Sequence, residues 1–168
     1  AVCALDATVD IARCVLKENR ASSVAAIYLG ACRATVRNCL VAENTADPIH
    51  ASSSTLNLYN NTIASHLGTA IAFTEMTEAT VANNIVMNNG AAFARDEYSK
   101  AAFSHNGYFN ASNDNPGFPP DALLGNGNIL GLPTFSGPYH LAPGSAFVDA
   151  GDDTAVQWTE TDLDEEAR

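Results

Sequence analysis

The sequence repeats with a period of 22 to 25 residues, and this repeat limits the folds open to the chain more than any other feature. Five segments align: IARCVLKEN, VRNCLVAEN, LYNNTIASH, VANNIVMNN and FSHNGYFNA, beginning at Ile11, Val36, Leu58, Val81 and Phe103. They are separated by steps of 25, 22, 23 and 22 residues. A period in the range of about 20 to 50 residues is typical of a solenoid, in which each repeat packs on its neighbours.

The aligned positions form apolar and polar columns. One apolar column is Ile11, Val36, Leu58, Val81 and Phe103, and a second is Leu16, Val41, Ile63, Val86 and Tyr108. Between them lie two polar columns: Arg13, Asn38, Asn60, Asn83 and His105, then Cys14, Cys39, Asn61, Asn84 and Asn106. Asparagine tolerates the left-handed backbone region, so these columns indicate a sharp bend between two strands. Stacked asparagines also hydrogen-bond one another along a ladder.

This pattern predicts an all-β fold, a right-handed parallel β-helix of about five or more rungs. Strands one period apart pair in parallel, and such connections are right-handed in almost all proteins. No segment keeps a 3.6-residue period long enough to fill the connections with helices. We expect the rungs in residues 1–110, a loop insertion in residues 111–132 and a loop-rich C-terminal rung or cap of the same domain in residues 133–168.

The four cysteines are Cys3, Cys14, Cys32 and Cys39, and none has the CxxC spacing of a zinc site. Cys14 and Cys39 share a column on adjacent rungs. Stacked strands lie about 4.8 Å apart, inside the Cα range of about 4.4–6.8 Å that disulfides span. A disulfide and a buried thiol stack are both compatible with this spacing, and Cys3 with Cys32 is the other conceivable pair.

The net charge of −11 argues against nucleic acid and against an anionic membrane surface, because both require clustered Lys and Arg. No apolar stretch approaches the roughly 20 residues of a membrane-spanning helix. No signal peptide is visible, and the pattern starts and stops abruptly. We therefore expect the chain to be part of a longer protein.

The C-terminal segment carries a recognisable motif, LPTFSGPYHLAPGSAFVDAG followed by TETDLDEEAR. Its distinctive residues are Pro133, Phe135, Tyr139, His140, Leu141, Pro143, Gly144, Ser145, Asp149, Ala150, Gly151, Thr161, Asp162, Leu163, Asp164 and Arg168. In these residues the chain resembles bacterial right-handed β-helix proteins of the pectate-lyase-like superfamily, although Glu165 stands where that group usually carries Gly. The resemblance implies the fold, an extracellular, periplasmic or cell-surface location and a polysaccharide-rich setting. It does not imply an activity, because one fold hosts many functions.

Catalytic chemistry has few candidate residues. A polysaccharide lyase needs a base and a cation beside a uronic carboxylate, and the basic pair Arg13 and Arg37 lies on neighbouring rungs. The alternative is that both are turn residues bonded to Glu18 and Glu43. A hydrolase needs carboxylates on consecutive rungs, whereas Asp10 and Asp47 are isolated in the central rungs.

Two binding sites are conceivable from the sequence. The polar turn residues Asn19, Asn44, His66 and Asn89 recur once per rung and could face a glycan or a protein partner. The C-terminal acids Asp149, Asp152, Asp153, Asp162 and Asp164 could hold Ca²⁺ through oxygen ligands, or could cap turns. No cofactor is required by either interpretation.

The sequence therefore favours a non-catalytic scaffold or a carbohydrate- or partner-binding module of a secreted or surface protein. The alternative is a fragment of a polysaccharide lyase or glycoside hydrolase. Solenoid ends also expose unpaired strand edges, which favours end-to-end self-association.

Overall fold

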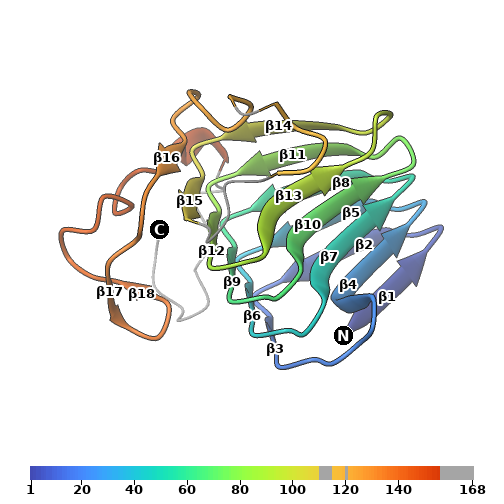
Figure 1. The fold of residues 1–168 in the computed structure, drawn as a ribbon, viewed down its shortest axis with the longest axis horizontal. Coiled ribbons are helices and arrows are strands. Elements are labelled where there is room, and N and C mark those ends of the chain that lie inside the picture. Colours follow the sequence, from blue (N-terminus) through green and yellow to red (C-terminus); the bar gives the residue numbers. More distant parts are fainter. Residues whose placement is uncertain (110–114, 120, 156–168) are drawn as a thin grey trace.

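The computed structural model describes residues 1–109, 115–119 and 121–155. The chain winds into a coil whose successive turns place short strands in three sheets (Figure 1). Sheet A contains β1 (Val2–Leu5), β4 (Val24–Gly30), β7 (Asp47–Ser52), β10 (Thr69–Thr74) and β13 (Ala91–Arg95). Sheet B contains β2 (Thr8–Ala12), β5 (Arg33–Arg37), β8 (Thr55–Tyr59), β11 (Glu78–Ala82) and β14 (Lys100–Ser104).

Sheet C contains β3 (Val15–Lys17), β6 (Leu40–Ala42), β9 (Thr62–Ala64), β12 (Ile85–Met87), β15 (Gly107–Phe109) and β16 (Ile129–Leu130). One strand from each sheet, taken in chain order, makes a rung, so β1, β2 and β3 form the first. The remaining elements are an antiparallel pair, β17 (Phe135–Gly137) and β18 (His140–Leu141), and a 3₁₀ turn, η1 (Asp153–Ala155).

The strand register follows the sequence repeat. In sheet B, Ile11 pairs with Val36, and the column continues through Leu58, Val81 and Phe103. All pairings in sheets A to C are parallel and join a rung to the next. The predicted right-handed parallel β-helix is therefore confirmed, with a sixth strand in sheet C.

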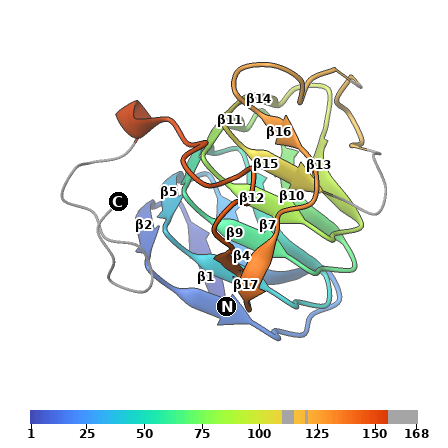
Figure 2. The ribbon, with the colours of Figure 1, turned by 90° about the vertical axis from the view of Figure 1, so that its left-hand side faces the viewer.

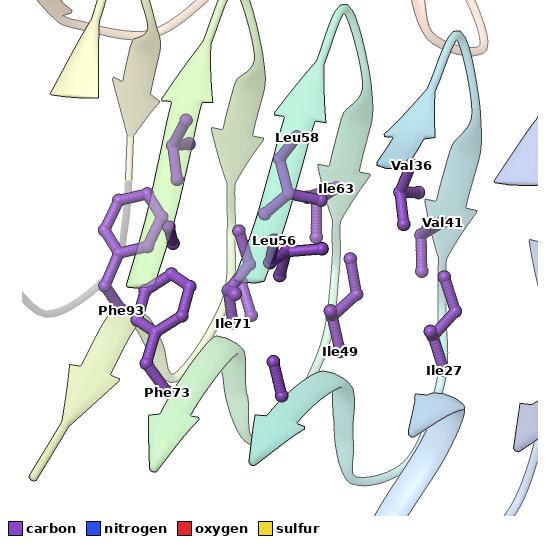
Figure 3. Close-up of a cluster of buried hydrophobic side chains, with 14 of the residues drawn as sticks. Ile27, Val36, Val41, Ile49, Leu56, Leu58, Ile63, Ile71, Phe73 and Phe93 are labelled. Carbon is purple, nitrogen blue, oxygen red and sulfur yellow. The ribbon is translucent and has the colours of Figure 1, made fainter. Parts of the chain in front are cut away.

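The apolar columns from all three sheets meet inside the coil (Figure 3). Both columns predicted from the repeat are buried there, apart from the partly buried Leu16 of the first rung. At the C-terminal end the core becomes aromatic: Phe93 lies 4.6 Å from Phe103 between ring centroids, and the Phe118 ring meets Phe103 edge-on at 5.3 Å. Residues 111–132, expected as an inserted loop, thus supply Phe118 to the core and β16 to sheet C.

Polar ladders line the three corners inside the coil. Each ladder residue accepts a hydrogen bond from the backbone N–H of its counterpart on the preceding rung. Examples are Ser54 Oγ from Cys32 N at 2.9 Å, Asn84 Oδ1 from Asn61 N at 3.0 Å and Asn89 Oδ1 from His66 N at 3.1 Å. The corner backbone bends away from strand pairing there, so these side chains satisfy groups that would otherwise be buried without partners.

The cysteines are all free thiols. Cys39 Sγ accepts a hydrogen bond from Cys14 N at 3.4 Å, so this pair continues the asparagine ladder as a thiol stack. Burial raises the pKa of the Cys39 thiol to about 11. The pairing of Cys3 with Cys32 is wrong, because Cys3 lies opposite Tyr28 in sheet A while Cys32 belongs to the ladder of Ser54.

The C-terminal segment, residues 133–155, lies outside the coil. It passes across the outward side of sheet C, in front of β9 and β12 (Figure 2). Of the two expected forms, a further rung or a cap, the described part of the segment does not show a parallel rung: it forms the antiparallel β17–β18 pair. Among these described residues no helix is long and apolar enough to cross a membrane.

Candidate functional site

A column of residues with positive φ marks the outside of the corner between sheets B and C. Rung by rung these residues are Arg13, Asn38, Asn60, Asn83, His105 and Gly127. We call them the outer bend column, and each immediately precedes a residue of the buried ladder. Asparagine and glycine adopt this backbone conformation at the lowest cost, which explains their prevalence.

The C-terminal segment is fastened to this corner near the fourth and fifth rungs. Asn83 Nδ2 donates to the Asp152 carbonyl oxygen at 3.0 Å, and Asp152 N donates back to Asn83 Oδ1 at 2.8 Å. The Phe147 ring packs against Gly107, where an added Cβ atom would overlap the ring. Glycine at position 107 therefore permits the close approach of the segment to β15.

A second attachment lies near the opposite end of sheet C. Tyr139 Oη donates to Glu43 Oε1 at 2.8 Å, and Lys17 Nζ approaches the same oxygen at 3.2 Å. Lys17 Nζ also lies 5.8 Å from the centroid of the Tyr139 ring. The hydrogen bond from Tyr139 is the main cause that holds the pKa of Glu43 below its usual value. Burial, and then this bond, raise the pKa of Tyr139.

A groove of about 640 Å³ runs between the corner and the C-terminal segment. Its size is within the range of about 300–1,000 Å³ that is typical of small-molecule sites. Leu40, Ile85 and Ile129 from sheet C contribute an apolar side. The polar side combines the outer bend column from Asn38 to His105 with residues of the segment that include Tyr139 and Asp149. We call this the corner groove.

Among the described residues, Asn60 Nδ2 and His105 Nδ1 of the outer bend column are buried without a hydrogen-bond partner, and both residues line the corner groove. Asn60 is only 8 % exposed. A buried polar group left unpaired costs about 1–3 kcal/mol.

The predicted binding residues occupy a different place. Asn44, His66 and Asn89 are buried and form the ladder at the corner between sheets C and A, with the half-buried Asn19 at its end. Their side chains bond to neighbouring rungs: Asn44 Nδ2 donates to the Leu16 carbonyl oxygen at 3.0 Å. The structure therefore gives this set a structural role inside the coil and does not place it on an open face.

The predicted basic pair is also divided. Arg37 makes a two-pronged contact with Asp10, with Nε to Oδ1 at 3.1 Å and Nη2 to Oδ2 at 3.0 Å. Its partner is thus Asp10 and not Glu43, which binds Lys17 instead. Arg13 is exposed at the first position of the outer bend column.

Only some of the acidic residues predicted as calcium ligands lie together in the structure. Asp149 and Asp153 line the corner groove, whereas the Asp152 carboxylate accepts hydrogen bonds from Thr154 N and Oγ1 at 2.9 and 2.7 Å. The Thr154 hydroxyl is the main cause that lowers the pKa of Asp152. Asp162 and Asp164 lie outside the described residues. Within those residues no three His, Cys, Asp or Glu side chains are grouped as a metal site would require, so calcium stays a prediction.

Asn60, His105 and Tyr139 were not predicted as site residues. The first two were assigned to a bend by their column, and Tyr139 was noted only as part of the C-terminal motif. One signal in the sequence could have identified the first two. This corner has two adjacent polar columns, but a single column is enough to form an internal ladder, so the side chains of the other column must point outside the coil.

Comparison with known proteins gives one match. A family model described as "Right handed beta helix region" matches residues 1–118. No curated protein and no solved structure matches the chain.

Proposed function

Because the chain belongs to the right-handed β-helix family, we propose that it is a scaffold of this fold whose corner groove binds a carbohydrate chain without catalysing its cleavage. The location we propose is extracellular, periplasmic or at the cell surface, where such ligands are abundant. The coil supplies a rigid wall of regularly spaced side chains, and the C-terminal segment supplies the opposite wall. Sites on rigid elements hold their ligand groups more accurately than sites on loops alone.

The observation that carries this proposal is the corner groove itself, a hollow of about 640 Å³ between the coil and the C-terminal segment. Its lining combines polar residues such as Asn60 and His105 with apolar side chains and Tyr139. Saccharides present hydroxyl groups at their edges and C–H groups on their ring faces, so they match both kinds of surface. Pockets that combine an apolar lining with a few convergent polar groups are the usual form of a binding site.

The alternative, a polysaccharide lyase or hydrolase, has no comparable support. Arg37 of its basic pair is hydrogen-bonded to Asp10, from Nε to Oδ1 at 3.1 Å and from Nη2 to Oδ2 at 3.0 Å. The same contact occupies Asp10, which was one of the few carboxylates in the central rungs. We therefore favour binding over catalysis.

The test is binding of the purified chain to an array of oligosaccharides, followed by calorimetry with the best ligand. Asn60→Gly removes the amide and suits the positive φ at this position, a conformation that glycine already adopts at the last position of the outer bend column, Gly127. We expect this variant to bind at least about tenfold more weakly, the equivalent of about 1.4 kcal/mol.

The matched control is Ala31→Gly. Ala31 also has a positive φ, is exposed and is not in the corner groove. It should bind like the parent chain. No binding to any oligosaccharide, or equal binding by Asn60→Gly and the parent, would overturn the proposed function.

A further inference from the structure

The connections from sheet A to sheet B form one edge of the coil (Figure 1). The strand register shows that these connections are one residue longer in the fourth and fifth rungs than in the first three. The same register places Glu75 and Met76 of the fourth rung beside Glu97 and Tyr98 of the fifth. We call these four residues the edge patch. Because the coil makes this corner three times with a shorter connection, the fold does not require the extra residue. Insertions on one face of a repeat protein often mark its binding face.

Two large apolar side chains of the edge patch are exposed. Met76 is 71 % exposed and Tyr98 is 65 % exposed, although each directly precedes a buried residue, Thr77 or Ser99. They occupy equivalent positions on adjacent rungs, so their backbones are separated by about the strand spacing of 4.8 Å. Single exposed apolar residues are common, whereas adjacent ones form the kind of patch that marks a protein–protein contact. Tyrosine and methionine are also enriched in such contacts.

The backbone of the edge patch is held in place by one carboxylate. Asp96 Oδ2 accepts from Glu75 N at 2.6 Å, and Asp96 Oδ1 accepts from Tyr98 N at 3.2 Å and Ser99 N at 2.9 Å. The bond from Glu75 N is the main cause that lowers the pKa of Asp96, so this side chain is ionised at neutral pH. Asp96 thus fastens the two longer connections to each other. A partner that binds such an ordered surface loses less conformational entropy than one that must order it.

The glutamates of the edge patch have hydrogen-bond donors but no cation. Glu75 Oε2 accepts from the hydroxyls of Ser52 and Ser53 at 2.6 and 3.3 Å. A hydrogen bond to Glu97 is the main cause that raises the pKa of Tyr98. Within the described part of the chain, neither Glu75 nor Glu97 takes part in an ion pair. Because like charges at equivalent positions of adjacent strands repel each other, a bound cation would stabilise this arrangement.

The basic residues of the fifth rung do not supply that cation. Arg95 Nε donates to the Gly117 carbonyl oxygen at 2.7 Å, and its Nη1 donates to that of Ser99 at 2.8 Å. Lys100 lies opposite Glu78 in sheet B, so its charge faces a carboxylate outside the edge patch. The positive charge that suits the edge patch must therefore come from another molecule.

We infer that the edge patch docks an arginine-containing, basic segment of a second protein. Arginine combines a planar cation that stacks on a tyrosine ring with a hydrocarbon stem that packs on an apolar side chain such as Met76. Its guanidinium group pairs with Glu97 or Glu75 through charge-assisted hydrogen bonds. The net charge of −11 attracts a basic partner over a longer range. This contact goes beyond the proposed function, because the edge patch is outside the lining of the corner groove.

The experiment measures binding of short peptides to the intact chain by calorimetry. The probe is a peptide of alternating arginine and leucine, compared with peptides in which lysine or serine replaces every arginine. We expect the arginine peptide to bind most tightly, the lysine peptide several-fold more weakly and the serine peptide not measurably. Affinity for the arginine peptide should fall as NaCl is added, because salt screens exposed charges. No binding of the arginine peptide, or equal binding of the serine peptide, would overturn the inference.

Two variants test the apolar part of the edge patch. Tyr98→Ser removes the ring and should weaken arginine-peptide binding by at least about tenfold. Met76→Asn suits the positive φ at this position and should weaken binding several-fold. The matched control is Leu67→Ser, because Leu67 is 84 % exposed in the connection from β9 to β10 and should be replaceable without effect. Equal affinities of Tyr98→Ser and the parent would show that the peptide binds elsewhere and would overturn the site.

A pair of charge variants separates local pairing from general attraction. Glu97→Gln should weaken binding several-fold and reduce its dependence on NaCl. Glu18→Gln changes the net charge equally at an exposed position in the connection from β3 to β4, and it should bind like the parent. Equal losses in both variants would reduce the effect to the overall charge and overturn the docking site. Self-association that Tyr98→Ser abolishes, without peptide binding, would replace the basic partner by a second copy of this chain.

Discussion

At the scale of single residues, the internal ladders require a side chain that can both accept and donate a hydrogen bond, and they do not require one particular residue type. Each position needs an acceptor for the N–H of the preceding rung and a donor for a carbonyl of that rung. Asn61 Nδ2 donates to the Val36 carbonyl oxygen at 2.8 Å, and Thr77 Oγ1 donates to that of Ala51 at 3.1 Å. Asparagine, serine, threonine and cysteine all meet this requirement, which explains why the columns are mixed in sequence.

His66 meets the same requirement only in its neutral form. Its Nδ1 accepts from Asn44 N at 3.0 Å, which leaves Nε2, 3.1 Å from the Val41 carbonyl oxygen, as the donor. Protonation would turn Nδ1 into a donor and break the first bond. Burial is the main cause that lowers the pKa of His66, although Glu43 nearby acts in the opposite direction.

We therefore expect an acid-sensitive step in stability that His66→Asn removes. Because the folded-state pKa is lowered, the unfolded chain takes up the proton first, and stability falls as the pH drops below the ordinary histidine value of 6.5. Asparagine keeps the ladder, as at Asn44 and Asn89. Urea unfolding from pH 7.5 to 5 should show the parent losing stability relative to the variant. If the free energy of unfolding depended on pH in the same way in both chains, this assignment would be contradicted. The half-buried His50 is present in both chains, so its titration does not affect the comparison.

At the scale of elements, the C-terminal segment differs from every strand of the coil. Its backbone does not continue the parallel pairing, and it is held by side-chain contacts at the two ends of the groove. Its docking is thus separable from the stability of the coil. Segments of this kind, which have few buried contacts, open locally at a lower free energy than the core.

Tyr139→Phe should loosen this segment selectively. The variant keeps the ring beside Lys17 and removes the hydroxyl that bonds Glu43 at 2.8 Å. Hydrogen exchange should become severalfold faster in residues 133–155, with the coil strands unchanged. Tyr98→Phe is the matched control, because Tyr98 is 65 % exposed and lies outside the segment. Equal exchange in both variants would show that this hydrogen bond does not hold the segment.

The same contact has a defined pH range. The lowered pKa of Glu43 means that its contribution is complete above the ordinary value of 4.5 and is lost as the pH falls through the lowered one. The raised pKa of Tyr139 means that its contribution is complete below 10.0 and is lost as the pH rises further. Protection of the segment in the parent, but not in Tyr139→Phe, should follow this window.

At the scale of the whole molecule, the sequence predicts the coil well and the groove poorly. The columns were predictable because residues one period apart must stack, and Ile11, Val36 and Leu58 do so in register. The groove was not, because it depends on Asn83 meeting Asp152, 69 residues away and outside the repeat. The ladder of Asn44 was mistaken for an open face because periodicity alone does not distinguish inward from outward polar columns.

The two ends of the coil differ within the described residues. At the C-terminal end, Phe118 covers the core and packs on Phe93 and Phe103. At the other end, β1, β2 and β3 are the edge strands of their sheets, and Val2 and Val9 in them are only half-buried although they pack on the core. Unpaired edges with exposed apolar columns are surfaces on which another chain can pair.

We therefore expect a polypeptide of these 168 residues to form dimers through its first rung, and not filaments. One open end per molecule gives a closed, symmetric contact, whereas open-ended growth needs two complementary ends. Light scattering after size-exclusion chromatography should show mass rising with concentration to a plateau at the dimer. Val9→Lys places a charge in the contact and should give a monomer. Val15→Lys is the control, because Val15 is 54 % exposed on the outward side of β3 and should leave dimerisation intact. A molar mass that grows beyond that of the dimer would show that the Phe118 end also associates, because molecules with only one associating end cannot form anything longer than a dimer.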